Sequence, residues 1–184
     1  MKNTNKDLEK KFSEAEKLRA DGNFSEAIIR FKNILKDYPK LQPALNNIAN
    51  CYVQINDFEL AENYYLECLK INSNTILTLN NLALLYLKNK NFKKALNVLQ
   101  ASLKKNLNQE HIAEKIAYCL TELDLPKDVD QFCEKFIKIY PQNKIILSYY
   151  RRNLFKIGKY EAGLKAYQKE TGVIELDDDK VNIA

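Results

Sequence analysis

Glycine and proline are scarce in this chain of 184 residues, which contains only four of each. Average proteins hold about 7% glycine and about 5% proline, so this backbone has few residues suited to tight hairpins or to loops that cradle phosphate. The scarcity favours an all-helical protein. Because 46% of the residues are apolar and 29% are charged, the chain can bury a sizeable interior, and its composition excludes a disordered protein.

Residues for catalysis and metal binding are also few. The one histidine, His111, starts no HExxH zinc motif, and Gly158 and Gly163 have P-loop spacing but lack the Lys and Ser/Thr that must follow. The four cysteines form no CxxC pair; they are Cys51, Cys68, Cys119 and Cys133. One histidine and four separated cysteines disfavour a standard zinc site and a histidine-dependent nucleophile. We predict no enzyme activity, no cofactor and no metal, with the four thiols reduced and packed.

No long apolar run is present. The longest, Leu82 to Leu87, has six residues, whereas a membrane-spanning helix needs about 20. The opening segment, MKNTNKDLEKKF, carries charge but lacks the apolar stretch of a secretory signal. We therefore expect a cytoplasmic protein without a membrane partner.

An internal repeat is the main feature of the sequence. Short turn-like segments recur every 34 residues without insertion or deletion: GNF at 22–24, NDF at 56–58, KNF at 90–92, DLP at 124–126 and GKY at 158–160. Apolar residues at every third or fourth position predict two amphipathic helices in each repeat, one on either side of the turn. Such repeats bury their apolar faces only against their neighbours in a stack.

This pattern resembles the tetratricopeptide repeat (TPR) family. A small residue stands at the eighth position of four repeats, Ala15, Ala49, Ala83 and Ala117, and an aromatic follows most turns. The resemblance implies an all-α fold, a right-handed superhelical α-solenoid of five antiparallel helix pairs whose first helices line a concave groove. We predict an N-terminal extension at 1–7, a TPR domain at 8–177 with repeats 8–41, 42–75, 76–109, 110–143 and 144–177, and a tail or linker start at 178–184.

The fourth and fifth repeats depart from the family pattern. Pro126 replaces the aromatic after the turn, which the first turn of a helix tolerates, but the replacement leaves an aromatic-sized gap. Arg151 and Gly163 occupy two small positions that face each other in the family. We interpret Gly163 as making room for the arginine stem, with Glu170 as a charge partner. Gly172 fits a left-handed helix C-cap.

The resemblance also indicates which side chains face the groove. They are five asparagines followed by leucine, cationic and aromatic residues: Asn46, Asn47, Asn50, Asn80, Asn81, Leu84, Lys115, Tyr118, Tyr149, Arg152 and Phe155. An amide side chain both donates to and accepts from a peptide backbone, while the cations and rings suit acidic or aromatic side chains. Biased base composition would also explain the asparagines, and packing between helices would also explain the rings.

The charge distribution favours a protein partner over nucleic acid. The chain has 29 basic and 24 acidic residues, and the net charge alternates in sign along the repeats, whereas a phosphate backbone calls for a continuous basic stripe. The carboxylate clamp of co-chaperone TPRs is also disfavoured, because Asn46 and His111 stand where lysines belong. We predict a scaffold or adaptor that holds an extended protein or peptide segment, acidic or aromatic in character.

Two alternatives stay open. The first is that the array serves as the N-terminal module of a larger enzyme whose catalytic domain is absent from this chain, and recruits substrates to it or dimerises it. The segment after Gly172 is also too short for the extra helix that commonly covers the last pair. An uncovered apolar face invites association, which leaves a homodimer through the C-terminal repeat as the other alternative.

Overall fold

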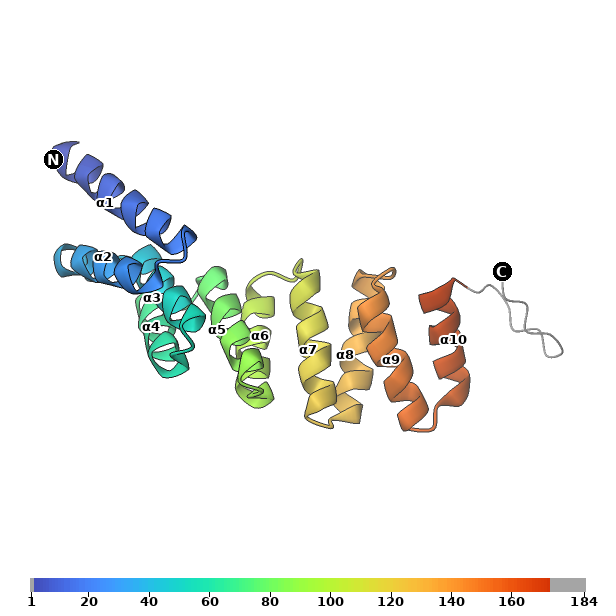
Figure 1. Cartoon of the computed structure of the whole chain (residues 1–184). Helices are drawn as coiled ribbons and strands as arrows, with labels where there is room; N and C mark the ends of the chain where they lie inside the picture. The colour runs from blue at the N-terminus through green and yellow to red at the C-terminus, as the bar shows by residue number, and fades with distance from the viewer. Residues whose placement is uncertain (1, 173–184) are drawn as a thin grey trace. The chain divides into compact units, whose positions relative to one another are not determined.

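The structure, a computed structural model, describes residues 2–172, with side chains from residue 6 onward. The predicted tail at 178–184 and residues 173–177 of the fifth repeat lie outside this range. Ten helices run through the described residues, and no strand occurs among them (Figure 1). The prediction of an all-α fold is confirmed.

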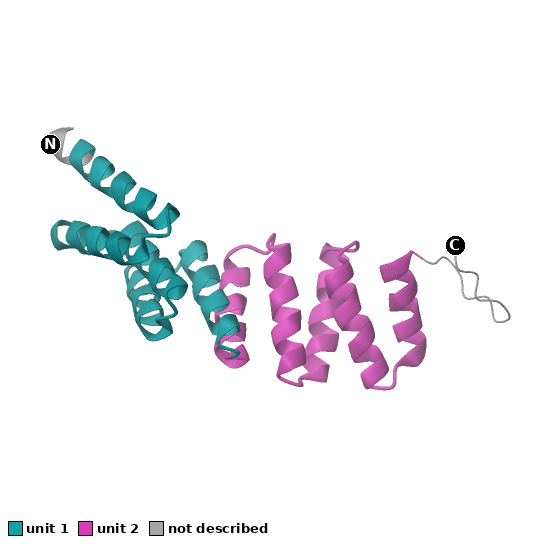
Figure 2. Ribbon diagram, in the orientation of Figure 1, with its two compact units in different colours: residues 1–90 teal, residues 91–184 magenta. Residues whose placement is uncertain are grey.

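The chain divides into two compact units, Met1–Lys90 and Asn91–Ala184 (Figure 2). The first unit contains α1 (Lys2–Ala20), α2 (Phe24–Asp37), α3 (Gln42–Gln54), α4 (Phe58–Ile71) and α5 (Ile76–Lys88). The second contains α6 (Phe92–Lys105), α7 (Glu110–Glu122), α8 (Pro126–Ile139), α9 (Lys144–Lys156) and α10 (Tyr160–Thr171). The boundary falls at the turn inside the third predicted repeat, and the predicted extension at 1–7 is helical from Lys2.

The helices keep the 34-residue period of the sequence. The first helices of repeats two to five begin at residues 42, 76, 110 and 144, and the second helices of all five repeats begin at 24, 58, 92, 126 and 160. Two residues before each second helix the backbone has a positive φ, at Gly22, Asn56, Lys90, Asp124 and Gly158. Glycine adopts this left-handed conformation without steric cost, and asparagine and aspartate tolerate it better than most residues, whereas Lys90 holds it under strain.

In the first unit, each helix packs on the next along the chain, and α3 also contacts α1 and α5. The small positions of the repeat are fully buried where the helices approach, at Ala15, Ala27, Ala49, Ala61 and Ala83. Larger apolar side chains fill the remaining space, among them Phe31, Leu45, Ile48, Tyr65 and Leu82. This core follows the apolar spacing of the sequence.

The second unit follows the same plan, with α6 to α10 packed sequentially and α7 also in contact with α9. Its buried side chains include Ala95, Leu99, Ile112, Ile116, Ala117, Ile146 and Leu154. Pro126 stands in the first turn of α8, and Gly172, with a φ of 78°, ends α10 as a left-handed C-cap. Both local predictions are confirmed.

All four cysteines are free and buried, as predicted. Burial raises the pKa of Cys51 and Cys119 to about 11 and the pKa of Cys133 to about 12, so these thiols stay protonated near neutral pH. Within residues 2–172, no helix is long and apolar enough to cross a bilayer.

Candidate functional site

Asparagines of α3 and α5 form a hydrogen-bond network in the first unit. Asn46 and Asn50 lie one helical turn apart on α3, and the Nδ2 atom of Asn81 donates to their Oδ1 atoms at 3.3 Å and 3.2 Å. The Tyr65 hydroxyl donates to Oδ1 of Asn50 at 2.6 Å, and the Thr78 hydroxyl donates to Oδ1 of Asn46 at 3.3 Å. The network links α3, α4 and α5, so the oxygens of two predicted groove asparagines are engaged inside the unit.

Asn47 differs from these asparagines. Its side chain is only 9% exposed, yet its amide has no hydrogen-bond partner among the residues that the structure describes. It borders a pocket of about 300 Å³ lined by Phe12, Glu16, Gln42, Pro43, Asn46, Asn47, Cys68, Thr75, Leu77 and Thr78. The other predicted groove residues of this unit, half-buried Asn80 and exposed Leu84, do not line the pocket.

Two residues that line this pocket, Phe12 and Glu16, were not predicted as site residues. A signal for them existed in the sequence, since they occupy in the first repeat the positions that Asn46 and Asn50 occupy in the second. Phe12 packs edge-on against Phe31, with the ring centroids 5.4 Å apart. Glu16 is exposed and forms no ion pair within the described part of the chain.

In the second unit, α7 and α9 bring together three predicted groove residues. The ring centroids of Tyr118 and Tyr149 lie 6.4 Å apart, and the Arg152 guanidinium lies 5.1 Å from the centroid of the Tyr149 ring. Phe92 meets Tyr118 edge-on, with the centroids 5.5 Å apart. The predicted Lys115 bonds within its own helix, where its Nζ donates to a backbone oxygen at 3.4 Å. The result is a surface that combines aromatic rings with a cation.

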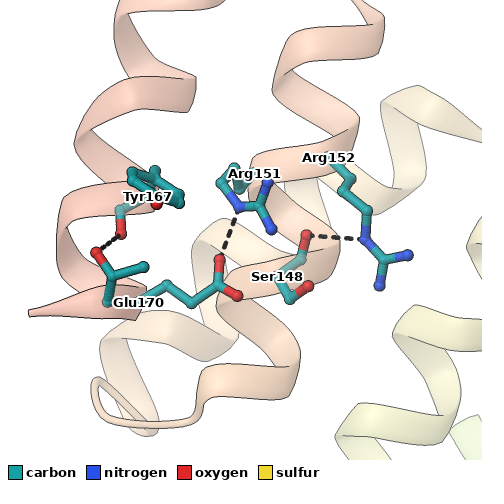
Figure 3. Close-up of polar contacts among 6 residues, drawn as sticks. Ser148, Arg151, Arg152, Tyr167 and Glu170 are labelled. Atoms are coloured by element: carbon teal, nitrogen blue, oxygen red, sulfur yellow. Dashed lines mark hydrogen bonds and ion pairs between the residues drawn. The ribbon is translucent and has the colours of Figure 1, made fainter.

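The two neighbouring arginines of α9 point to different surroundings (Figure 3). Arg151 reaches α10, where its Nε lies 2.7 Å from Oε2 of Glu170, with side chains 25% and 18% exposed. The predicted charge partner is therefore confirmed. Arg152 points away from this pair, and its Nε donates to the Ser148 carbonyl oxygen at 3.4 Å. It contacts no carboxylate among the residues with described side chains.

The interpretation of Gly163 was wrong. A Cβ atom at this glycine would lie 3.2 Å from atoms of the Phe155 ring, and no Arg151 atom is among its nearest neighbours. Gly163 thus makes room for Phe155, whose ring also lies 6.3 Å from the ring of Tyr160, centroid to centroid. Phe155, predicted as a groove residue, has its ring packed against α10.

A second pocket lies beside Pro126, where the sequence predicted a gap. It measures about 70 Å³ and is lined by Thr121, Asp124, Leu125, Pro126, Val129, Tyr149, Arg152, Asn153 and Lys156. The Asn153 Nδ2 atom donates to the Pro126 carbonyl oxygen at 2.9 Å. Because a cavity that holds benzene measures roughly 150 Å³, this gap is smaller than an aromatic ring.

Comparisons with known proteins agree with the repeat pattern. Residues 43–75 and residues 75–106 match two family models, each described as a tetratricopeptide repeat. The comparison with curated proteins gives no match.

Several solved structures are similar to the chain. A crystal structure of MamA protein has a TM-score of 0.77 at 17% identity, with 90% of each chain covered. The structure of YrrB, described as a TPR protein with an unusual peptide-binding site, has a TM-score of 0.73 at 15% identity, with 88% of this chain and 84% of YrrB covered. PilF of Pseudomonas aeruginosa has a TM-score of 0.67 at 16% identity, with 94% of this chain and 79% of PilF covered.

At these identities the likeness establishes the fold alone, a helical-repeat solenoid. The helices on both sides of residues 43–106 continue the same 34-residue register. Residues 43–106 of this chain therefore belong to the tetratricopeptide repeat family.

Proposed function

We propose that the chain is a non-enzymatic scaffold that binds extended segments of protein partners on the first helices of its repeats. The amide of Asn47 carries this proposal, because it is nearly buried, unpartnered within the described residues and placed at a pocket. An amide side chain can donate to one peptide unit and accept from another. A bound backbone would thus satisfy a polar group that the fold itself leaves without a partner.

The other pocket residues suit a peptide as well. Phe12, Pro43 and Leu77 supply apolar area for one side chain, and Leu77 is 62% exposed. Glu16 places an unpaired carboxylate beside them, which favours a donor or cation on the bound segment. The description of YrrB as having a peptide-binding site supports the same class of ligand.

The second unit offers a different chemistry for the same role. Tyr118 and Tyr149 present rings, and Arg152 presents a cation without a carboxylate partner among the described side chains. Aromatic and arginine side chains are enriched where proteins bind one another. This surface suits the acidic or aromatic segment expected from the sequence.

Asn47→Ala tests the proposal. Peptides selected from a random 12-residue phage library against the intact chain serve as probes, with affinity measured by fluorescence anisotropy. The loss of one hydrogen-bonding amide is expected to weaken binding by about 1–2 kcal/mol, roughly 5- to 30-fold. The melting temperature should not change, because the side-chain amide of Asn47 bonds to no described residue of the chain.

Asn74→Ala, the same substitution at an exposed residue outside the pocket, is the control and should bind as the parent chain does. If every selected peptide binds the Asn47→Ala chain with unchanged affinity, the role of this amide is contradicted. A library from which no peptide is enriched would overturn the proposed function.

A further inference from the structure

The second repeat shows how a lysine and an aromatic ring are arranged beside the turn. Lys88, at the end of α5, donates from Nζ to Oδ1 of Asn56 at 3.1 Å. The same ammonium lies 4.9 Å from the centroid of the Phe58 ring. Asn56 of the turn, the Phe58 ring and Lys88 therefore form one cluster. The ring occupies the space between successive repeats, and the ammonium lies over the ring.

The fourth repeat has the same cluster without the ring. Lys156 and Asp124 stand two repeat periods after Lys88 and Asn56, and they form the corresponding pair. Pro126 stands where Phe58 would be, and the pocket of about 70 Å³ lies at this place. The missing ring thus leaves a cavity inside an otherwise intact contact.

The size of the pocket limits what can enter it. On the same measure a water molecule needs about 10–15 Å³ and benzene roughly 150 Å³. The carbon-rich walls come from Leu125, Pro126, Val129 and the Tyr149 ring. A pocket of this size and lining suits a branched aliphatic side chain better than a ring or a water cluster.

The charges around the pocket indicate that the bound segment also carries an acidic residue close to the aliphatic one. Lys156 is already paired with Asp124, and the Asn153 amide bonds to the Pro126 carbonyl oxygen. Arg152 lies over Tyr149 and donates a hydrogen bond from Nε to the carbonyl oxygen of Ser148. The unpaired charge at the pocket is therefore a guanidinium, which matches a carboxylate in shape and charge.

We propose that this pocket receives a valine, leucine or isoleucine side chain from an extended segment of a protein partner, while an aspartate or glutamate within two residues of it binds Arg152. The inference rests on the proposed function and specifies the motif of the partner. The replacement of the repeat's aromatic by Pro126 thereby creates a binding site rather than a simple packing defect.

Selection of the same random 12-residue library against the intact chain tests the motif. The enriched peptides that keep their affinity for the Asn47→Ala chain are expected to carry an aliphatic residue within two positions of a carboxylate. Pro126→Phe places a ring in the pocket or over its mouth, and either position should weaken such peptides about tenfold or more. Arg152→Gln, at an exposed residue that does not threaten folding, should weaken them about fivefold or more.

Lys138→Gln is the charge-matched control, since Lys138 is an exposed cation of the same unit that does not line the pocket, and it should leave affinity unchanged. Thermal melts of each variant show whether it folds. The inference is overturned if every enriched peptide depends on Asn47, or if the peptides that do not depend on Asn47 lack the aliphatic–acidic pair. It is also overturned if the Pro126→Phe and Arg152→Gln chains bind these peptides as tightly as the parent chain does. Other enriched peptides that depend on Asn47 would still support the proposed function, whereas a library with no enrichment defeats both.

Discussion

The two units place different chemistry at the same repeat positions. Asn50 and Asn81 of the first unit stand two periods before Tyr118 and Tyr149 of the second. The first pair is joined by an amide hydrogen bond of 3.2 Å, and the second by a ring contact of 6.4 Å between centroids. The repeat therefore fixes which positions meet but leaves open how they interact.

A second pair of equivalent positions forms a polar contact in both units, but with different residues. In the first unit, Gln42 donates from Nε2 to the Thr75 hydroxyl oxygen at 3.2 Å. At the equivalent positions of the second unit, Asn143 donates from Nδ2 to Oε1 of Glu110 at 2.6 Å. The donor is the first residue of α3 in the first unit and the N-cap residue of α9 in the second, yet the contact is retained. Small buried residues set the helix spacing, so the side chains above them are free to differ between the units.

The largest expected effect comes from matched cavities in the two cores. Ile48 and Ile116 stand two periods apart and are fully buried. Replacing either with alanine should lower the free energy of unfolding by about 2–5 kcal/mol, because a cavity remains. Repeat arrays unfold in local segments, so hydrogen exchange should show faster opening mainly in the unit that carries the change.

Urea denaturation of both variants gives the size of the loss, and hydrogen exchange with mass spectrometry gives its place. Equal loss of protection across residues 2–172 in both variants would show that the two units open as one body. Differences between the two units could then not be assigned to separate cores.

A smaller effect on the free energy of unfolding distinguishes the asparagine network of the first unit from the Tyr118–Tyr149 contact of the second. Asn81→Ala removes two hydrogen bonds to buried or half-buried oxygens, which should cost about 1–2 kcal/mol of unfolding free energy. Tyr149→Phe keeps the ring, and the Tyr149 hydroxyl has no hydrogen-bond partner among the described residues, so the loss should stay below about 0.5 kcal/mol. Chemical denaturation measures both, and equal losses would contradict the assigned roles.

The sequence predicted much of the fold because periodicity and small residues act locally. The 34-residue register placed the turns, Pro126 and Gly172 behaved as their backbone chemistry requires, and the gap beside Pro126 followed from the loss of a ring. The pairing of Arg151 with Glu170 also followed, since opposite charges stood at positions that meet.

The site was less predictable, because it depends on which of several equivalent contacts forms. Nothing in the order of residues separates Asn47, which borders a pocket without a partner, from Asn46, whose oxygen accepts two hydrogen bonds. Gly163 was assigned to the wrong neighbour because two large residues of α9, Arg151 and Phe155, could each have used its space. Side-chain direction decided both cases, and periodicity does not encode it.

Another small effect concerns the turns, where Lys90 of the first unit and Gly158 of the second both have left-handed backbones. Lys90 has a φ of 54° and Gly158 a φ of 78°. Lys90→Gly relieves strain but adds freedom to the unfolded chain, so it should stabilise by about 0.5 kcal/mol. Gly158→Ala should destabilise by about 1 kcal/mol through backbone strain alone, since a Cβ there meets nothing within 4 Å. Thermal melts should therefore move in opposite directions, and shifts of the same sign would show that these turns do not share one conformation.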